Sequence, residues 1–312
     1  MRNRCDCIER CIVSAFGRQI AVCRSVMWTK SFAILILSGA AYAGDFSAGI
    51  QCYEAKDYNC AIREWQPLAD RGIAQAQYNL ALIYSRGEGV AQDVAKAAGL
   101  FEKAANIGIV QAQYNLAQCY LNGSGVPKDE DKAISWFQKA AELGDPNAAN
   151  NLGTILEGRK DYDNAAKWYL KAADEGLAMA QFNVGQMFDL GRGFTQDFAK
   201  AAEFYERAAQ QGDAGALCNL AILYYNGEGV KIDRLKAYEY FLLAGKAGDT
   251  RASSLLGRTA NKLQKKQITE AEELAKQFEA SHPFRNHLEL SAPEPIMNAD
   301  SKVTSSTPAG LD

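Results

Sequence analysis

Small and apolar residues recur along this chain at helical spacing, in a unit repeated about every 36 residues. Glycines end the successive units at steps of 36, 32, 36 and 36 residues: Gly108, Gly144, Gly176, Gly212 and Gly248. A period of this length is typical of stacked helical hairpins, each too small to bury its own apolar face. The pattern predicts an all-α protein, an α/α solenoid of about six helix-turn-helix repeats.

Each unit is expected to contain two helices that pack closely. In the first helix, two columns of small residues and one of apolar residues share a face: Ala76, Ala112, Ala148, Ala180 and Ala216; Ala81, Ala117, Gly153, Gly185 and Ala221; Leu80, Leu116, Leu152, Val184 and Leu220. The second helix carries aromatic pairs: Trp136-Phe137, Trp168-Tyr169, Phe204-Tyr205 and Tyr240-Phe241. Aromatics at one repeated position indicate a core rather than a ligand site.

Four units carry a Gly-x-Gly loop between their helices: Gly87–Gly89, Gly123–Gly125, Gly191–Gly193 and Gly227–Gly229. Phosphate loops share this pattern, but here no strand is expected before the loop and no Lys-Ser or Lys-Thr pair follows it. An aspartate after each loop is instead expected to cap the second helix: Asp93, Asp129, Asp197 and Asp233. The unit around 147–176 is shorter and lacks this loop.

The repeats also set the domain boundaries. We expect a divergent first hairpin at 44–72, five repeats at 73–249 and a pair of capping helices at 250–282. Residues 283–312 form a tail that becomes rich in Ser, Pro, Ala and Thr, and it is expected to be disordered.

Residues 1–43 have the features of a leader. Lys30 precedes an apolar run at 32–37, and Ala41-Tyr42-Ala43 has the small-x-small form that signal peptidase accepts. We expect a signal peptide cleaved after Ala43 and a periplasmic or secreted product. Met27 would be the more usual start for such a signal, and an unusually long leader that includes residues 1–26 is the alternative. The alternative to a signal peptide is an ordinary buried helix.

The charge of the chain argues against a nucleic-acid partner. The formal net charge is −3, and six basic against two acidic residues in 1–43 leave −7 on the remainder. Binding to nucleic acid would need a basic surface. No run of 18 or more apolar residues occurs, so the sequence predicts no integral membrane span.

Residues suited to catalysis are scarce. The two histidines, His282 and His287, follow the repeats, so neither a Ser-His-Asp triad nor a Cys-His pair can be built on the repeats alone. No Cys/His cluster has zinc spacing. The sequence therefore predicts no enzyme, no cofactor and no metal site.

Four of the eight cysteines lie beyond the leader. Cys119 and Cys218 take positions that are apolar or aromatic in sister repeats, which predicts small core residues. Cys52 and Cys60 fall on two facing helices of the first hairpin, where an oxidising compartment allows a disulfide, with two free thiols as the alternative.

The repeat resembles a known family. The string Ala76-Gln77-Tyr78-Asn79-Leu80-Ala81, followed by Tyr84, Gly87-Glu88-Gly89-Val90, Asp93, Lys96-Ala97 and Lys103-Ala104-Ala105, resembles the Sel-one-like repeat (SLR), a relative of tetratricopeptide repeats. The resemblance covers roughly residues 45–250 and implies a right-handed superhelix that acts as a scaffold for protein complexes. A cysteine-rich subgroup is linked to β-lactam binding and hydrolysis, but its recurring Cys-x7-Cys pair occurs here only as Cys52 and Cys60.

The resemblance also implies a candidate binding site. One asparagine takes the same place on the first helix of each repeat: Asn79, Asn115, Asn151, Asn183 and Asn219. In tetratricopeptide hairpins this position faces the concave groove, where asparagines bind the backbone or C-terminal carboxylate of an extended peptide. The alternative is that these amides stabilise packing between repeats. Four further residues are expected to share the groove: Gln118, Gln186, Leu82 and Tyr225.

The expected function is that of a non-catalytic, exported scaffold that binds a protein or peptide partner in the bacterial envelope through its concave groove. Two alternatives remain open. One is a β-lactam-binding or hydrolysing protein like the cysteine-rich subgroup, and the other is a secreted, host-directed interaction factor.

Overall fold

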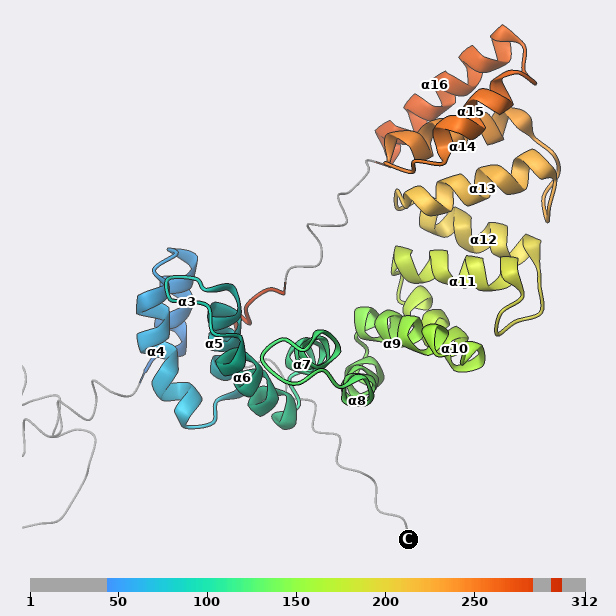
Figure 1. Ribbon diagram of the computed structural model, residues 1–312. Coiled ribbons are helices and arrows are strands. Elements are labelled where there is room, and N and C mark those ends of the chain that lie inside the picture. Colours follow the sequence, from blue (N-terminus) through green and yellow to red (C-terminus); the bar gives the residue numbers. More distant parts are fainter. Residues whose placement is uncertain (1–43, 283–292, 299–312) are drawn as a thin grey trace, which may run out of the picture. The chain divides into compact units, whose positions relative to one another are not determined.

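The structure, a computed structural model, describes residues 44–282 and 293–298, so the leader predicted over 1–43 lies outside the described residues. The described residues form 14 helices and no strand (Figure 1). Successive helices pack against one another along the chain, except that the last helix packs against the helix two before it. This arrangement confirms the α/α solenoid of helical hairpins. None of the described helices is long and apolar enough to cross a membrane.

A hairpin of α3 (Phe46–Glu54) and α4 (Tyr58–Asp70) precedes the repeats. Five hairpins follow: α5 (Ala74–Arg86) with α6 (Val94–Ile107), α7 (Val110–Asn122) with α8 (Glu130–Glu142), α9 (Pro146–Gly158) with α10 (Tyr162–Asp174), α11 (Ala178–Leu190) with α12 (Phe198–Ala209), and α13 (Ala214–Asn226) with α14 (Arg234–Lys246). The last two helices, α15 (Ala252–Ala260) and α16 (Lys265–Ser281), both pack against α14.

The helix boundaries follow the predicted start and stop signals. The side chains of the four aspartates after the glycine loops accept hydrogen bonds from backbone N–H groups of the first turn, at 2.9–3.1 Å for the N–H three residues on. These contacts confirm the N-caps. The five glycines that end the units have φ between 85° and 105°, a left-handed conformation in which a Cβ would be strained.

The core forms where the small residues of each first helix meet the aromatics of the second. The second member of each predicted aromatic pair is buried, while the first member is partly buried: Phe137, Tyr169, Tyr205 and Phe241 are the buried members. Gly185 on α11 lies so close to Tyr205 that a Cβ would come within 2.7 Å of its ring. The aromatics are therefore core residues, as expected.

A set of buried glutamines ties each of three first helices to the helix before it, a feature that we did not anticipate from the sequence. Their Nε2 atoms donate hydrogen bonds of 3.0–3.3 Å to carbonyl groups eight residues earlier: Gln77 to Ala69, Gln113 to Ala105, and Gln181 to Ala173. Carbonyls in the last turn of a helix have no partner within that helix. Each of these carbonyls accepts from the backbone N–H of the glycine three residues on, and the glutamine adds a second hydrogen bond that joins successive hairpins.

The tail departs from the sequence expectation at residues 293–298. These residues lie within the segment that its composition marks as disordered, yet they form an extended stretch hydrogen-bonded to α5. The physical reason is that α5 offers donors and an acceptor to main-chain groups, a contact that leaves no trace in composition. The other tail residues, 283–292 and 299–312, lie outside the described part of the chain.

Candidate functional site

The first asparagine of the row, Asn79 on α5, binds the backbone of the extended segment. Its Oδ1 accepts a hydrogen bond from the N–H of Ile296 at 2.8 Å, and its Nδ2 donates to the carbonyl oxygen of Ile296 at 3.0 Å. The Asn79 side chain is fully buried. One side-chain amide thus satisfies both main-chain polar groups of one residue.

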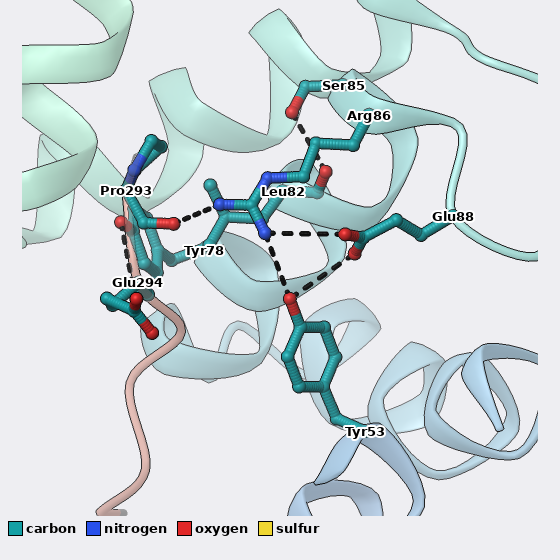
Figure 2. A network of polar contacts seen from close by, with 8 residues as sticks. All are labelled: Tyr53, Tyr78, Leu82, Ser85, Arg86, Glu88, Pro293 and Glu294. Atoms are coloured by element: carbon teal, nitrogen blue, oxygen red, sulfur yellow. Dashed lines mark hydrogen bonds and ion pairs between the residues drawn. The ribbon is translucent and has the colours of Figure 1, made fainter. Parts of the chain in front are cut away.

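Two further residues of α5 bind carbonyl groups of the same segment, as Figure 2 shows. The Tyr78 hydroxyl donates to the carbonyl of Glu294 at 3.2 Å, and the Arg86 guanidinium donates to the carbonyl of Pro293. Burial raises the pKa of the Tyr78 hydroxyl well above its usual value, so the group stays protonated and able to donate.

The first hairpin holds Arg86 in place. The Arg86 Nη1 donates to the Tyr53 hydroxyl at 3.0 Å and lies 3.5 Å from Glu88 Oε1. The Tyr53 hydroxyl in turn donates to Glu88 Oε2 at 3.3 Å (Figure 2). Burial raises the pKa of Tyr53, and the Arg86 charge opposes this shift. Because Tyr53 belongs to α3 and Glu88 to the first glycine loop, these two segments together orient the Arg86 guanidinium.

Three asparagines of the later repeats contact neighbouring hairpins instead. Asn151 Nδ2 donates to the Tyr114 hydroxyl at 3.2 Å, and Asn183 Nδ2 donates to Asn150 Oδ1 at 2.9 Å. Asn219 Oδ1 accepts from Arg251 Nη1 at 3.2 Å. These are the contacts expected if the row stabilises packing between repeats. The row is therefore mixed: the first member is bound to an extended segment, Asn151 and Asn183 are bound to the preceding repeat, and Asn219 is bound to Arg251 at the start of α15.

The second member, Asn115 on α7, has spare hydrogen-bonding capacity. Its side chain approaches the Tyr78 hydroxyl closely enough to oppose the rise in the pKa of that group. Its Nδ2 is nonetheless buried with no partner at hydrogen-bond geometry among the described residues. Since an unpaired buried donor is costly, Asn115 is a group that a bound main chain could satisfy.

The other predicted groove residues have different surroundings. Gln118 donates to the Tyr114 hydroxyl at 3.2 Å, next to the row, and Gln186 is half-buried on α11. Leu82 is fully buried in the hydrophobic cluster on which Ile296 packs, so it is a core residue rather than an exposed groove residue. Tyr225 lines a separate cavity of about 200 Å³ beside α14 and α15.

The cysteines and metal-binding side chains show no catalytic arrangement in the described residues. Cys52 and Cys60 are joined in a disulfide, with their Cα atoms 5.6 Å apart. Cys119 and Cys218 are free, and burial raises the pKa of both thiols to about 11, which keeps them in the unreactive thiol form. No group of three or more His, Cys, Asp or Glu suited to a metal occurs among them.

Sequence reasoning missed Tyr78 and Arg86, although one signal for Arg86 was present. The residues seven positions after the five asparagines are Arg86, Asn122, Gly158, Leu190 and Asn226. Only the first is charged, and a departure from a repeat at one position points to a local role. The contribution of Ile296 had no such signal, because its backbone makes the hydrogen bonds.

Comparisons with known proteins agree with this fold. A family model described as the Sel1 repeat matches five consecutive units: 74–109, 110–145, 146–177, 178–213 and 214–249. No curated protein matches the chain.

Two solved structures are similar to it. One is a protective antigen present in uropathogenic Escherichia coli strains that displays an SLR fold; it is 33% identical, with a TM-score of 0.67 over 72% of this chain and 49% of that one, so the chain spans about half its length. The other is a Sel1 repeat protein from Oxalobacter formigenes, 30% identical, with a TM-score of 0.65 over 73% of this chain and 98% of that one. Since the five matched units cover more than half of its residues, the chain belongs to the Sel1 repeat family.

Proposed function

We propose that this protein is a non-catalytic, exported scaffold that binds extended segments of partner proteins along the first helices of its repeats. Sel1 repeat proteins are commonly scaffolds for protein interactions. The observation that carries the proposal is the pairing of the Asn79 amide with the backbone of Ile296. Such a contact recognises main chain rather than side chain, so it suits a surface that takes protein segments.

The absence of assembled catalytic groups among the described residues supports a binding role. The two free thiols are kept protonated by burial, and the described side chains form no metal cluster. A hydrolase of the cysteine-rich subgroup would also be expected to pair cysteines in most repeats. Here the pair Cys52–Cys60 lies in the hairpin before the first Sel1 repeat.

Two features support export to the periplasm or beyond. The leader has the charge, apolar run and small-x-small site of a signal peptide. A disulfide also persists in an oxidising compartment and is rare in the cytosol. The partner is then expected to be a protein of the envelope or of the surroundings of the cell.

Site-specific photo-cross-linking in living cells tests the proposal. A photoreactive residue in place of Gln118 on α7 or Gln186 on α11 is expected to trap a partner protein. The matched controls are Glu102 on α6 and Glu203 on α12, which are exposed on second helices. Equal trapping from both sets of helices would contradict a binding face on the first helices. Adducts found in the culture supernatant rather than the periplasm would favour a secreted, host-directed factor.

A further inference from the structure

The segment 293–298 matches the length of α5 that it contacts. Arg86, near the C-terminal end of α5, binds Pro293, and Asn79, seven residues earlier, binds Ile296. Seven helical residues rise about 10.5 Å, and three residues of extended chain span about 10 Å. The segment therefore runs opposite to α5, and only an extended chain reaches both contacts.

The two prolines of the segment suit this binding mode. Three carbonyl groups and one N–H of the segment are bound by α5: the carbonyls of Pro293, Glu294 and Ile296, and the N–H of Ile296. Proline lacks an N–H, so Pro293 and Pro295 leave no donor unsatisfied against the helix. Proline also keeps the chain extended before binding, which lowers the entropy lost when the segment is ordered.

One side chain of the segment contributes apolar contact. Ile296 packs against the cluster that contains Leu82, whereas the side chains of Glu294 and Met297 are exposed. The surface thus binds main-chain groups beside two prolines that offer no N–H, packs one aliphatic side chain, and leaves the residue between the prolines exposed. The surface is therefore expected to accept a segment of the form Pro-x-Pro-aliphatic.

The first repeat alone assembles this combination of groups. The residues that precede the five asparagines are Tyr78, Tyr114, Asn150, Phe182 and Cys218, and the positions of Arg86 carry uncharged residues in the later repeats. Asn79 also has no Sel1 repeat before it, so its amide is not used between repeats. The second repeat repeats the Tyr-Asn pair as Tyr114-Asn115, and the unpaired Asn115 Nδ2 offers a donor to a longer segment.

We infer that the surface formed by Tyr78, Asn79 and Arg86 is a binding site for an extended Pro-x-Pro-aliphatic segment of a partner protein, and that residues 293–298 of the same chain occupy it as an intramolecular competitor. This deepens the proposed function and rests on it only for the existence of a partner. The ten residues 283–292 tether the competitor to α16, and a short tether gives a local concentration on the order of mM. A partner segment must displace the tail to bind.

Fluorescence anisotropy with a labelled synthetic peptide tests this inference on the purified full chain. The peptide has the sequence of residues 290–300. Ile296→Asp in the protein places a carboxylate against the apolar cluster and should release the tail. A tail that fills the site about 90% of the time weakens an external peptide about tenfold, so Ile296→Asp is expected to bind the peptide about tenfold more tightly than the wild type.

Three controls separate the site from general effects. Met297→Asp changes an exposed residue of the same segment and should leave peptide affinity as in the wild type. A peptide that itself carries Ile296→Asp should not bind. Adding Arg86→Gln to Ile296→Asp should lower the affinity about tenfold again. Thermal unfolding close to that of the wild type shows that the variants fold.

Each contrary outcome overturns a defined part of the inference. Peptide binding to neither the wild type nor Ile296→Asp would refute the site, and equal binding to both would refute the competitor. A second copy of the chain is the rival source of the segment, because a tether of ten residues spans at most about 36 Å and so limits the reach of a chain's own tail. A dimer in sedimentation that dissociates on Ile296→Asp would show that source. The proposed function fails separately, if photo-cross-linking from α7 and α11 traps no partner.

Discussion

Gly153 on α9 lies against Tyr169 on α10, so close that a Cβ on residue 153 would come within 2.7 Å of two carbons of the Tyr169 ring. The ring is buried, and its hydroxyl donates to Thr154 or Glu157, each 3.1 Å away. Core packing holds the buried ring and a hydrogen bond holds its hydroxyl, so the ring has little room to move away from Gly153. This contact sets how closely the two helices of that repeat approach.

Gly153→Ala is therefore expected to lower the stability of the protein. Overpacking of a close-packed core costs about 1–3 kcal/mol. Gly158→Ala, in the same helix, is the matched control because nothing lies within 4 Å of the Cβ that it adds. Since alanine is the better helix former, this control should be neutral or stabilising by up to about 1 kcal/mol. Urea unfolding followed by circular dichroism measures both; equal midpoints for the two variants would refute the close approach.

The asparagine row should separate into binding and packing members. Asn183→Ala leaves Asn150 without the donor that it has at 2.9 Å, and losing such a bond costs about 1–3 kcal/mol. Asn115→Ala removes a buried donor that has no partner, so it should not lower stability. Melting temperatures of the two variants test this, and a larger loss for Asn115→Ala would contradict the assignment.

The pair of Asp189 and Tyr205 gives the protein a pH dependence of a defined sign. Burial raises the pKa of the Asp189 carboxyl, although the Tyr205 hydroxyl, 3.1 Å away, opposes the shift. The native state then holds its proton to higher pH than the unfolded state does. The contribution of this group to stability is present at low pH and is lost as pH rises through the native pKa.

Asp189→Asn removes that dependence while it keeps an acceptor for Tyr205. The variant is expected to be more stable than the wild type at pH 7, and the difference should shrink as pH falls toward 4. Asp174→Asn, an exposed change on α10, serves as the control. Urea midpoints measured across this pH range provide the test, and a stability difference that grows on acidification would contradict the sign.

The disulfide predicts the thiol count of the protein without its predicted leader, residues 1–43. Denatured, unreduced protein without residues 1–43 should show two thiols, from Cys119 and Cys218, against four after reduction. A crosslink that closes a loop of eight residues is worth about 2.5 kcal/mol in the loop-entropy model. Cys52→Ser with Cys60→Ser should therefore destabilise the first hairpin by that order. Four reactive thiols in unreduced protein would contradict the bond.

The repeat architecture was predictable because many equivalent positions obey the same physics. Aspartate caps, left-handed glycines and buried aromatics such as Tyr205 recur in each unit, so each one supports the interpretation of the others. The row of asparagines was likewise visible. The division of this row into binding and packing members was not visible, because the partner of each amide lies on a neighbouring element. That partner also changes identity, from Tyr114 to Asn150 to Arg251.

The extended segment was the least predictable feature. The contact joins residues 217 positions apart, and α5 binds mainly carbonyl groups that every residue possesses. Composition alone assigned Pro293 and its neighbours to a disordered tail. Arg86 was the one visible signal, since no sister repeat has a charge at that place.

Amide hydrogen exchange at Ile296, followed by NMR on full chain labelled with nitrogen-15 isoleucine, tests the central pairing most directly. The synthetic peptide of residues 290–300 in free solution supplies the unprotected rate. If Asn79 holds the Ile296 N–H about 90% of the time, exchange in the protein is about tenfold slower than in the peptide, and Arg86→Gln reduces this protection. Exchange at the same rate in protein and peptide would contradict the account.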